Sequence, residues 1–143
     1  MTAVVLPHAP ASAAVARRSL SSELAGAGVS SAVVGDAALV ISELVGNAVR
    51  HASPLPGGAV RVEWSLHPDT VEISVTDGGS HEVPVAVQAD EAATGGRGLS
   101  IVEALSRTWG TRRAGRGMVV WAHIPRVQGG RARRGCEPLA TVT

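Results

Sequence analysis

The sequence contains no lysine, phenylalanine or tyrosine, and it has a single cysteine, Cys136. One cysteine cannot form a disulfide within the chain and cannot supply the thiolates of a structural zinc site. No apolar run approaches the roughly 20 residues that a transmembrane helix needs. The first apolar residues precede Arg17 and Arg18, whereas a secretory signal peptide begins with its basic residues. We therefore expect a cytoplasmic protein that does not enter a membrane.

Basic residues are also sparse and unevenly placed. Residues 1–125 contain nine arginines against 11 acidic residues, a net charge of −2, and residues 126–143 contain four arginines against one acidic residue, a net charge of +3. The body of the chain thus lacks the excess of positive charge that a nucleic-acid-binding face requires. We expect no direct binding to nucleic acid, and a short basic tail of this kind is usually a solvated chain end.

What remains is the composition of one globular domain. The 143 residues are 45% hydrophobic and 17% charged, which is enough to bury a single core. We divide the chain into an N-terminal arm (1–9), a folded domain (10–125) and a basic, disordered tail (126–143). The apolar residues 3–6 end at Pro7 and predict an edge strand or a docked arm.

Two helices are predicted in the first part of the domain. The first covers residues 11–27, between Pro10 and nearby glycines, and the second runs to Ala52 after a cap at Ser30 or Ser31. The second helix carries an apolar stripe at three- and four-residue spacing. Glu43, Asn47 and His51 follow one another at four-residue intervals, so they share a different, polar face of this helix.

The rest of the domain predicts an antiparallel sheet. Apolar and polar residues alternate over 60–66 and 71–76, as in a hairpin with one buried face, and residues 110–114 and 117–124 predict a second hairpin. A long irregular segment, 80–94, is typical of a functional lid, and a helical pattern follows from Leu99 to Trp109. The order of elements predicts an α+β, two-layer sandwich in which helices cover one face of a mainly antiparallel sheet.

The polar face of the second helix is the first candidate for chemistry. An asparagine oxygen such as that of Asn47 is a hard neutral ligand that suits Mg²⁺, which takes most of its other ligands from phosphates and water. A carboxylate one turn earlier, Glu43, could orient or deprotonate a nucleophile near the same phosphate. Taken alone, this pair is better explained as two polar residues on a solvated face.

Two glycine-containing motifs are the other candidates. Asp77-Gly78-Gly79 ends a strand, where a carboxylate can accept a hydrogen bond from a buried amino group and a glycine admits a flat ligand. Gly95-Gly96-Arg97-Gly98 opens a helix, whose N-terminal amides attract phosphate. Each also has an ordinary explanation, the first as an Asp-Gly turn and the second as a flexible connector.

In this order and on these elements, the three motifs resemble the N, G1 and G2 boxes of the GHKL (Bergerat-fold) ATP-binding domain. That fold is shared by gyrase, the Hsp90 chaperone, histidine kinases and MutL, and the matching stretches are ELVGNAVRHA, VTDGG and TGGRGLSIVEAL. The short chain and its ending GMVVWAHIP look most like the anti-sigma factor serine kinases of the RsbW/SpoIIAB type. The resemblance covers residues of roughly 10–125.

The resemblance implies ATP and Mg²⁺ as cofactors and assigns a role to each matching residue. Glu43 corresponds to the catalytic carboxylate, Asn47 to the Mg²⁺ ligand, and Asp77 to the carboxylate that recognises the adenine amino group. The remaining nucleotide-binding positions implied are Arg50, His51, Gly79, Gly96, Arg97, Gly98 and Leu99. The implied partners are a sigma factor and a small antagonist protein that is phosphorylated on serine or threonine, and members of this family often form homodimers.

The sequence departs from the family pattern at two places. His81 stands where the G1 box often has another glycine, and Met118, Val119 and Val120 provide no hydroxyl where the last strand often has a threonine. These departures motivate an alternative, an ATP-binding protein-interaction module of the same fold that transfers no phosphate. A third hypothesis, an ATPase domain serving a separate histidine-kinase partner, has no phospho-accepting histidine helix to support it.

Overall fold

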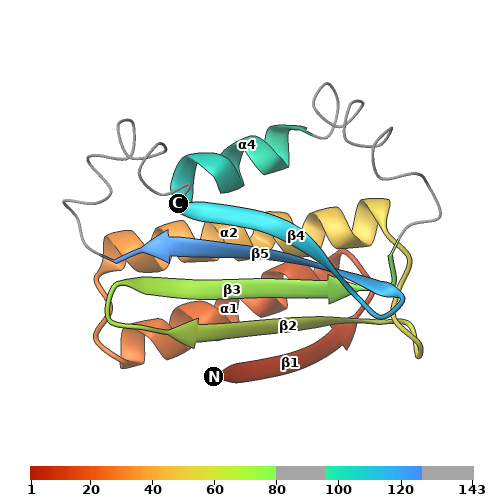
Figure 1. Ribbon diagram of the computed structural model, residues 1–143. Helices are drawn as coiled ribbons and strands as arrows, with labels where there is room; N and C mark the ends of the chain where they lie inside the picture. Colours follow the sequence, from red (N-terminus) through yellow and green to blue (C-terminus); the bar gives the residue numbers. More distant parts are fainter. Residues whose placement is uncertain (80–95, 127–143) are drawn as a thin grey trace.

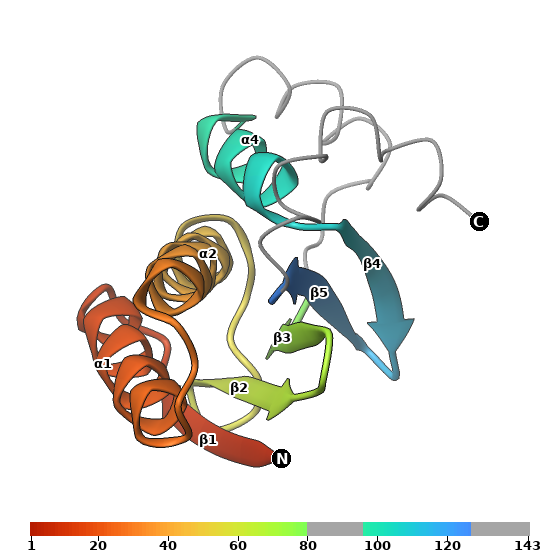
Figure 2. The same ribbon diagram turned by 90° about the vertical axis from the view of Figure 1, so that its left-hand side faces the viewer.

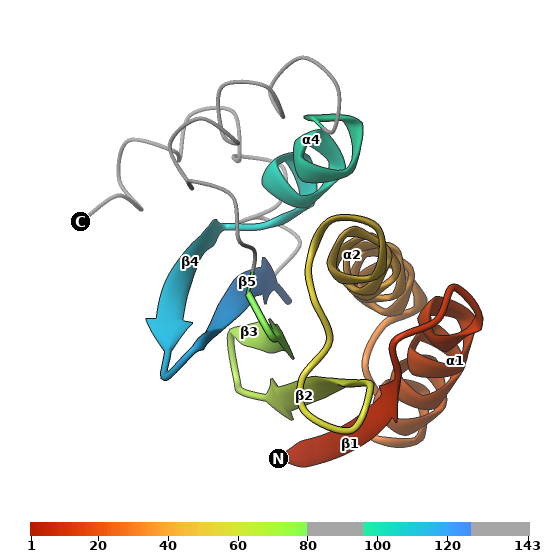
Figure 3. The same ribbon diagram turned by 90° about the vertical axis from the view of Figure 1, so that its right-hand side faces the viewer.

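The computed structural model describes residues 1–79 and 96–126 and shows two layers, a five-stranded sheet and three helices on one of its faces (Figures 1, 2 and 3). Every pair of neighbouring strands is antiparallel, and the strand order is β1-β2-β3-β5-β4. The elements are β1 (Thr2–Pro7), α1 (Ala11–Gly26), α2 (Ser31–His51), β2 (Ala59–Leu66), β3 (Thr70–Asp77), α4 (Gly96–Leu105), β4 (Thr108–Ala114) and β5 (Gly117–Pro125). The predicted α+β sandwich is confirmed.

The two long helices begin and end close to the predicted positions. Ser30 caps α2, because its side-chain oxygen accepts a hydrogen bond from the Val33 N–H at 3.3 Å and so satisfies one of the unpaired amides of the first turn. In α1 the buried positions Ser12, Ala16, Leu20 and Leu24 recur every four residues, which places them on one face of the helix.

Helix α2 lies over the middle of the sheet and contacts α1, α4 and β3. By length and mean hydropathy (1.6) it could cross a membrane, although the sequence pattern suggested no such segment. Its apolar side chains explain this composition, because Val40, Ile41 and Val45 are fully buried in the core between the sheet and the helices. The helix is apolar because it is the central helix of the domain.

The sheet shows the predicted alternation. In β2 and β3 the helix-facing residues are buried, and the strands pair so that Val62 lies opposite Val75 and Trp64 opposite Ile73. The strand predicted at residues 3–6 is the edge strand β1, which pairs with β2. The other edge of the sheet is β4.

One predicted boundary is wrong. Trp109 was expected in the helix that starts after Gly98, but that helix ends at Leu105 and Trp109 lies in β4, opposite Ala122. The Trp109 side chain packs against the core from the sheet. Trp109 fits the helical spacing but is a strand residue that faces the helices. The helix also begins earlier than expected, at Gly96 within the glycine motif.

Several predictions fall on segments outside the described residues. These are the lid at 80–94, the departure at His81, and the tail from residue 127 onward. The one described residue of the predicted tail is Arg126, whose Nη1 donates to the His67 carbonyl at 2.8 Å and whose backbone N–H donates to the Asp69 carbonyl at 2.8 Å. These bonds join the end of β5 to the β2–β3 turn.

Candidate nucleotide-binding site

The three predicted motifs lie at the same end of the molecule. The C-terminal end of α2, the C-terminal end of β3 and the N-terminus of α4 all point to the right in Figure 1, and α2 contacts both β3 and α4. The sequence separates these motifs by some 30 and 20 residues, and the fold brings them together because α2 lies across the sheet next to β3.

On the polar face of α2, Asn47 has a hydrogen-bond partner and Glu43 has none among the described residues. Asn47 is held by Arg50, whose Nη2 donates to the Asn47 Oδ1 at 2.8 Å. To make this bond the guanidinium lies back along the helix over Gly46, where a Cβ would stand 3.1 Å from Nη1. By helix geometry the Cβ of Glu43 lies about 6 Å from the Cβ of Asn47. Glu43 makes no hydrogen bond or ion pair with the residues that the structure describes. The pair thus offers one carboxylate and one amide oxygen that already faces a cation.

His51 completes the predicted face of α2 at its last residue. It is exposed, and together with Arg50 it puts basic side chains in the last turn of the helix. Cations there interact favourably with the negative end of the helix dipole, so a stabilising role within α2 accounts for both residues alongside the predicted role in binding phosphate.

Asp77 is the most unusual of the predicted site residues. It ends β3 on the helix-facing side of the sheet and is only 5% exposed. Its Oδ1 accepts a hydrogen bond from the Gly79 N–H at 2.7 Å, and its other oxygen accepts none from the described residues. Burial raises the pKa of Asp77, against the opposing effects of the Gly79 N–H and of the His8 imidazole. A buried carboxylate with one oxygen available is suited to accept a hydrogen bond from a ligand.

The two glycines after Asp77 are required by the packing of the chain itself. A Cβ on Gly78 would stand 2.1 Å from the Pro54 carbonyl oxygen, and one on Gly79 would stand 2.8 Å from the Arg116 carbonyl oxygen. Gly79 also has a φ of 86°, which disfavours other residues. The motif therefore serves to let the segment after α2 and the β4–β5 turn close tightly around the end of β3.

The predicted phosphate-binding motif lies at the start of α4. Gly96, Arg97 and Gly98 form its first turn, and Leu99 follows, half-buried. The first amides of a helix have no partner within it and attract anions. Helix α4 contacts α2, and its N-terminus lies toward the same end of the molecule as the C-terminus of α2 (Figure 1).

Sequence analysis missed one residue at this end of the molecule, His8. It was assigned no role, because a histidine in an N-terminal segment carries no local signal. In the structure its Nε2 lies 3.1 Å from the Ala48 carbonyl oxygen and 2.9 Å from the Ala52 carbonyl oxygen, at the end of α2. Its partners are 40 and 44 residues away in sequence, so only the tertiary structure reveals the contact.

With this geometry established, the comparison with protein families is decisive. The model of the histidine kinase-like ATPase domain matches residues 6–124, most of the chain. The chain belongs to the histidine kinase-like ATPase family. No curated protein sequence matches it.

Two solved structures illustrate the fold of this ATPase domain. One contains the RsbU and RsbW domains of Rv1364c from Mycobacterium tuberculosis, with a TM-score of 0.66 and 22% identity over 87% of this chain. The other is the histidine kinase domain of the Erythrobacter litoralis EL346 blue-light activated histidine kinase, with a TM-score of 0.51 and 22% identity over 71% of this chain. This chain spans 32% and 48% of those two chains, and at such identity the likeness shows the fold alone.

The side chains of the ATPase domain fit Mg²⁺ only if a bound nucleotide supplies further ligands. Within the described residues no group of three or more His, Cys, Asp or Glu side chains could hold a metal ion. Asn47 offers a hard oxygen that already accepts a bond from a cationic group, and Mg²⁺ commonly takes one or two protein oxygens and completes its shell with phosphates and water. Asn47, with Glu43 nearby, therefore fits a nucleotide-bound Mg²⁺ better than a free ion.

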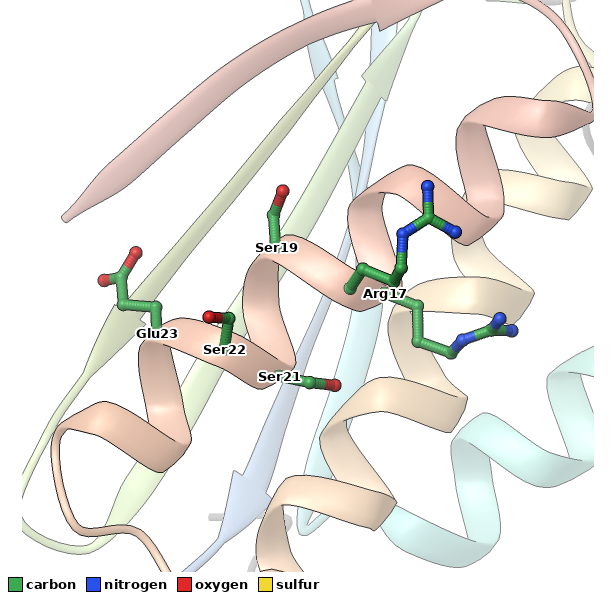
Figure 4. Close-up of a pocket in the computed structure, with 6 residues that line it drawn as sticks. Arg17, Ser19, Ser21, Ser22 and Glu23 are labelled. Atoms are coloured by element: carbon green, nitrogen blue, oxygen red, sulfur yellow. The ribbon is translucent and has the colours of Figure 1, made fainter.

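A separate recess in the ATPase domain is not part of this site. It runs along the outer side of α1 and is lined by Arg17, Arg18, Ser19, Ser21, Ser22 and Glu23 (Figure 4). None of the predicted nucleotide-binding residues lines it, and Glu23 is engaged by the Thr2 hydroxyl at 2.7 Å. The recess is shallow and open to solvent, and it lies apart from the cluster around Asp77.

Proposed function

We propose that this chain is a cytoplasmic ATP- and Mg²⁺-dependent serine/threonine protein kinase of the anti-sigma factor type. It phosphorylates a small antagonist protein and controls transcription through a sigma factor, without binding nucleic acid or a membrane itself. The observation that carries the proposal is Asp77, a buried carboxylate with an available oxygen at the end of β3 in a member of the histidine kinase-like ATPase family. The likeness of the motifs to anti-sigma factor kinases supports the choice within that family.

In this proposal Asp77 accepts a hydrogen bond from the adenine amino group, and the amides at the start of α4 bind the phosphates. Asn47 and Arg50, on α2, act at the phosphate end in this proposal. Mg²⁺, when bound to the nucleotide phosphates, neutralises the charge that develops during transfer. Arg50 now donates to the Asn47 oxygen through Nη2, so its positive charge would compete with Mg²⁺ at that oxygen.

Glu43 supplies the base for the transfer. Its carboxylate makes no bond with the described residues and so is available to a substrate hydroxyl. The serine or threonine oxygen attacks the γ-phosphorus, the bond from that phosphorus to the ADP oxygen breaks, and the hydroxyl proton passes to Glu43. The products are a phosphorylated antagonist protein and ADP.

The test uses Mg-ATP and a candidate antagonist protein encoded next to this chain, with phosphorylation followed by mass spectrometry. Glu43→Gln should keep ATP affinity and lose roughly 10²- to 10⁴-fold in the rate of transfer, the usual contribution of a general base. The matched control is Glu63→Gln, since Glu63 pairs with Arg61 on the sheet face opposite the helices. Equal rates for wild type and Glu43→Gln would contradict the role of Glu43.

One observation favours the alternative function, a catalytically silent ATP-binding interaction module. The residue directly opposite Asp77 on β5 is Met118, so that position carries a thioether in place of a hydroxyl. Wild-type protein that binds ATP but transfers no phosphate would support the silent module. Failure to bind ATP at millimolar concentration, measured by thermal stabilisation, would exclude both functions.

A further inference from the structure

His8 lies directly after the edge strand β1 and reaches the end of α2. Its backbone N–H donates to the Gly58 carbonyl at 2.9 Å, which fixes the residue beside the loop that follows α2. Its ring Nε2 lies within hydrogen-bond distance of the Ala48 and Ala52 carbonyl oxygens. Carbonyl oxygens only accept, so Nε2 must carry a hydrogen and donate it. His8 therefore caps the Ala52 carbonyl, which has no partner within the helix, and shares the Ala48 carbonyl with the Ala52 N–H, which donates to it at 3.1 Å.

The residue after Ala52 connects this cap to the end of β3. The Ser53 N–H donates to the Gly79 carbonyl at 2.8 Å, and the Gly78 N–H donates to the Ser53 carbonyl at 2.7 Å. These two bonds join the chain that leaves α2 to the two residues that follow Asp77. A displacement of Ala52 would therefore be transmitted to the end of β3 through one intervening residue.

The same ring also acts electrostatically on the site. Burial is the largest influence on Asp77 and raises its pKa, while the Gly79 N–H and the positive charge of protonated His8 lower it. Of the basic residues in the last turn of α2, Arg50 is bonded to Asn47 and His51 is exposed. Arg113 and Arg116 on the β4–β5 hairpin are exposed as well.

We propose that His8 is a positioning residue for the nucleotide site. Its Nε2–H holds the end of α2, and with it Ser53, in the place that sets the distance between Asn47 at the phosphate end and Asp77 at the adenine end. This inference rests on the proposed ATP site. His8 itself touches neither the nucleotide nor the acceptor protein.

The chain offers a sharp set of variants at this position. A glutamine amide nitrogen reaches about as far as the Nε2 of histidine, whereas an asparagine amide nitrogen reaches only about as far as Nδ1. His8→Gln should keep the contacts with the two carbonyls. His8→Asn and His8→Ala should lose them. Comparing His8→Gln with His8→Asn therefore distinguishes the effect of an N–H donor at the position of Nε2 from the effect of side-chain size.

The first measurement is amide hydrogen exchange by NMR in nucleotide-free protein. In His8→Ala and His8→Asn we expect the Ser53 and Gly78 amides to exchange about tenfold faster than in wild type, the effect of losing roughly one net hydrogen bond. The Val62 and Ile73 amides in the middle of the sheet should change far less. Equal acceleration of all four amides would mean that His8 stabilises the whole domain, and it would overturn the positioning role.

The second measurement is ATP affinity by calorimetry as a function of pH. At neutral pH we expect His8→Gln to match wild type and His8→Asn and His8→Ala to bind about tenfold more weakly. On acidification, affinity should fall at a higher pH in His8→Gln than in wild type, because Asp77 then lacks the neighbouring positive charge. Coinciding pH profiles would remove the electrostatic part of the role.

The two possible failures can be told apart. If wild type binds no ATP, the proposed function fails and the role of His8 in it fails too. If wild type binds ATP and all three variants bind equally well, with unchanged exchange at Ser53 and Gly78, the proposed function stands and the inference about His8 is overturned.

Discussion

Replacing Gly78 by alanine tests whether the end of β3 and the segment after α2 are packed as tightly as the structure shows. A Cβ at this position would stand 2.1 Å from the Pro54 carbonyl oxygen and 3.0 Å from the Ser53 carbonyl oxygen. Both neighbours are backbone atoms, so the clash cannot be relieved by rotating a side chain. We expect Gly78→Ala to displace the segment at Ser53 and Pro54 and to destabilise the domain.

The magnitude follows from the distances. Contacts to a Cβ stay above 3.0 Å, so the Pro54 oxygen must move by at least 0.9 Å, the difference between 3.0 Å and 2.1 Å. A similar movement of Ser53 would lengthen its 2.7 Å bond from the Gly78 N–H to about 3.6 Å, which is no longer a hydrogen bond. Overpacking costs about 1 to 3 kcal/mol and each of the two bonds about 1 kcal/mol, so we expect a loss of about 3 to 5 kcal/mol.

The assay is equilibrium unfolding in urea together with thermal unfolding, for which such a loss corresponds to a decrease in Tm of about 10 to 17 °C. The matched control is Gly35→Ala within α2, where a Cβ meets no atom within 4 Å. Alanine is a better helix former than glycine, so the control should gain about 0.5 to 1 kcal/mol. A loss below about 1 kcal/mol for Gly78→Ala would refute the tight packing.

Three further predictions follow from single contacts. Burial raises the pKa of Asp77, so its ionisation destabilises the folded wild type as the pH rises through that pKa. The stability of Asp77→Asn relative to wild type, measured by urea unfolding, should therefore increase with pH, and a pH-independent difference would contradict this. Because Arg50 occupies the Asn47 oxygen, Arg50→Ala should increase the factor by which Mg²⁺ over EDTA improves ATP affinity; an unchanged factor would contradict competition. Ser30→Ala removes the bond to the Val33 N–H and should cost about 1 kcal/mol of unfolding free energy, with no effect on ATP affinity.

The fold was largely predictable because most of its elements carry strong local signals. Alternation in β2 and β3 has a period of two residues, and the apolar stripe of α2 has a helical period with a serine cap at its start. The prediction was wrong at Trp109, which fits the helical spacing of Leu105 but lies in β4. Local periodicity cannot distinguish the end of a helix from the start of a buried strand when both faces point into the same core.

The sequence by itself determined the residue types of the candidate site and the elements that carry them. Glu43 and Asn47 share a helix face because they are four residues apart, and Asp77 ends a strand because two glycines follow it. The family resemblance then implied their roles, and the family match bears out the fold and the family.

Only the tertiary structure decided how these residues are held. The burial of Asp77 and the hydrogen bonds between Ser53 and the two glycines after Asp77 depend on where segments distant in sequence meet. The bond from Arg50 to Asn47 joins residues only three apart on α2, and it depends on the side-chain conformation of Arg50. The contact of His8 with the end of α2 spans 44 residues. Such contacts leave no periodic pattern in the sequence, because they require only a hydrogen-bond donor or acceptor at one position, and that position is set by the fold.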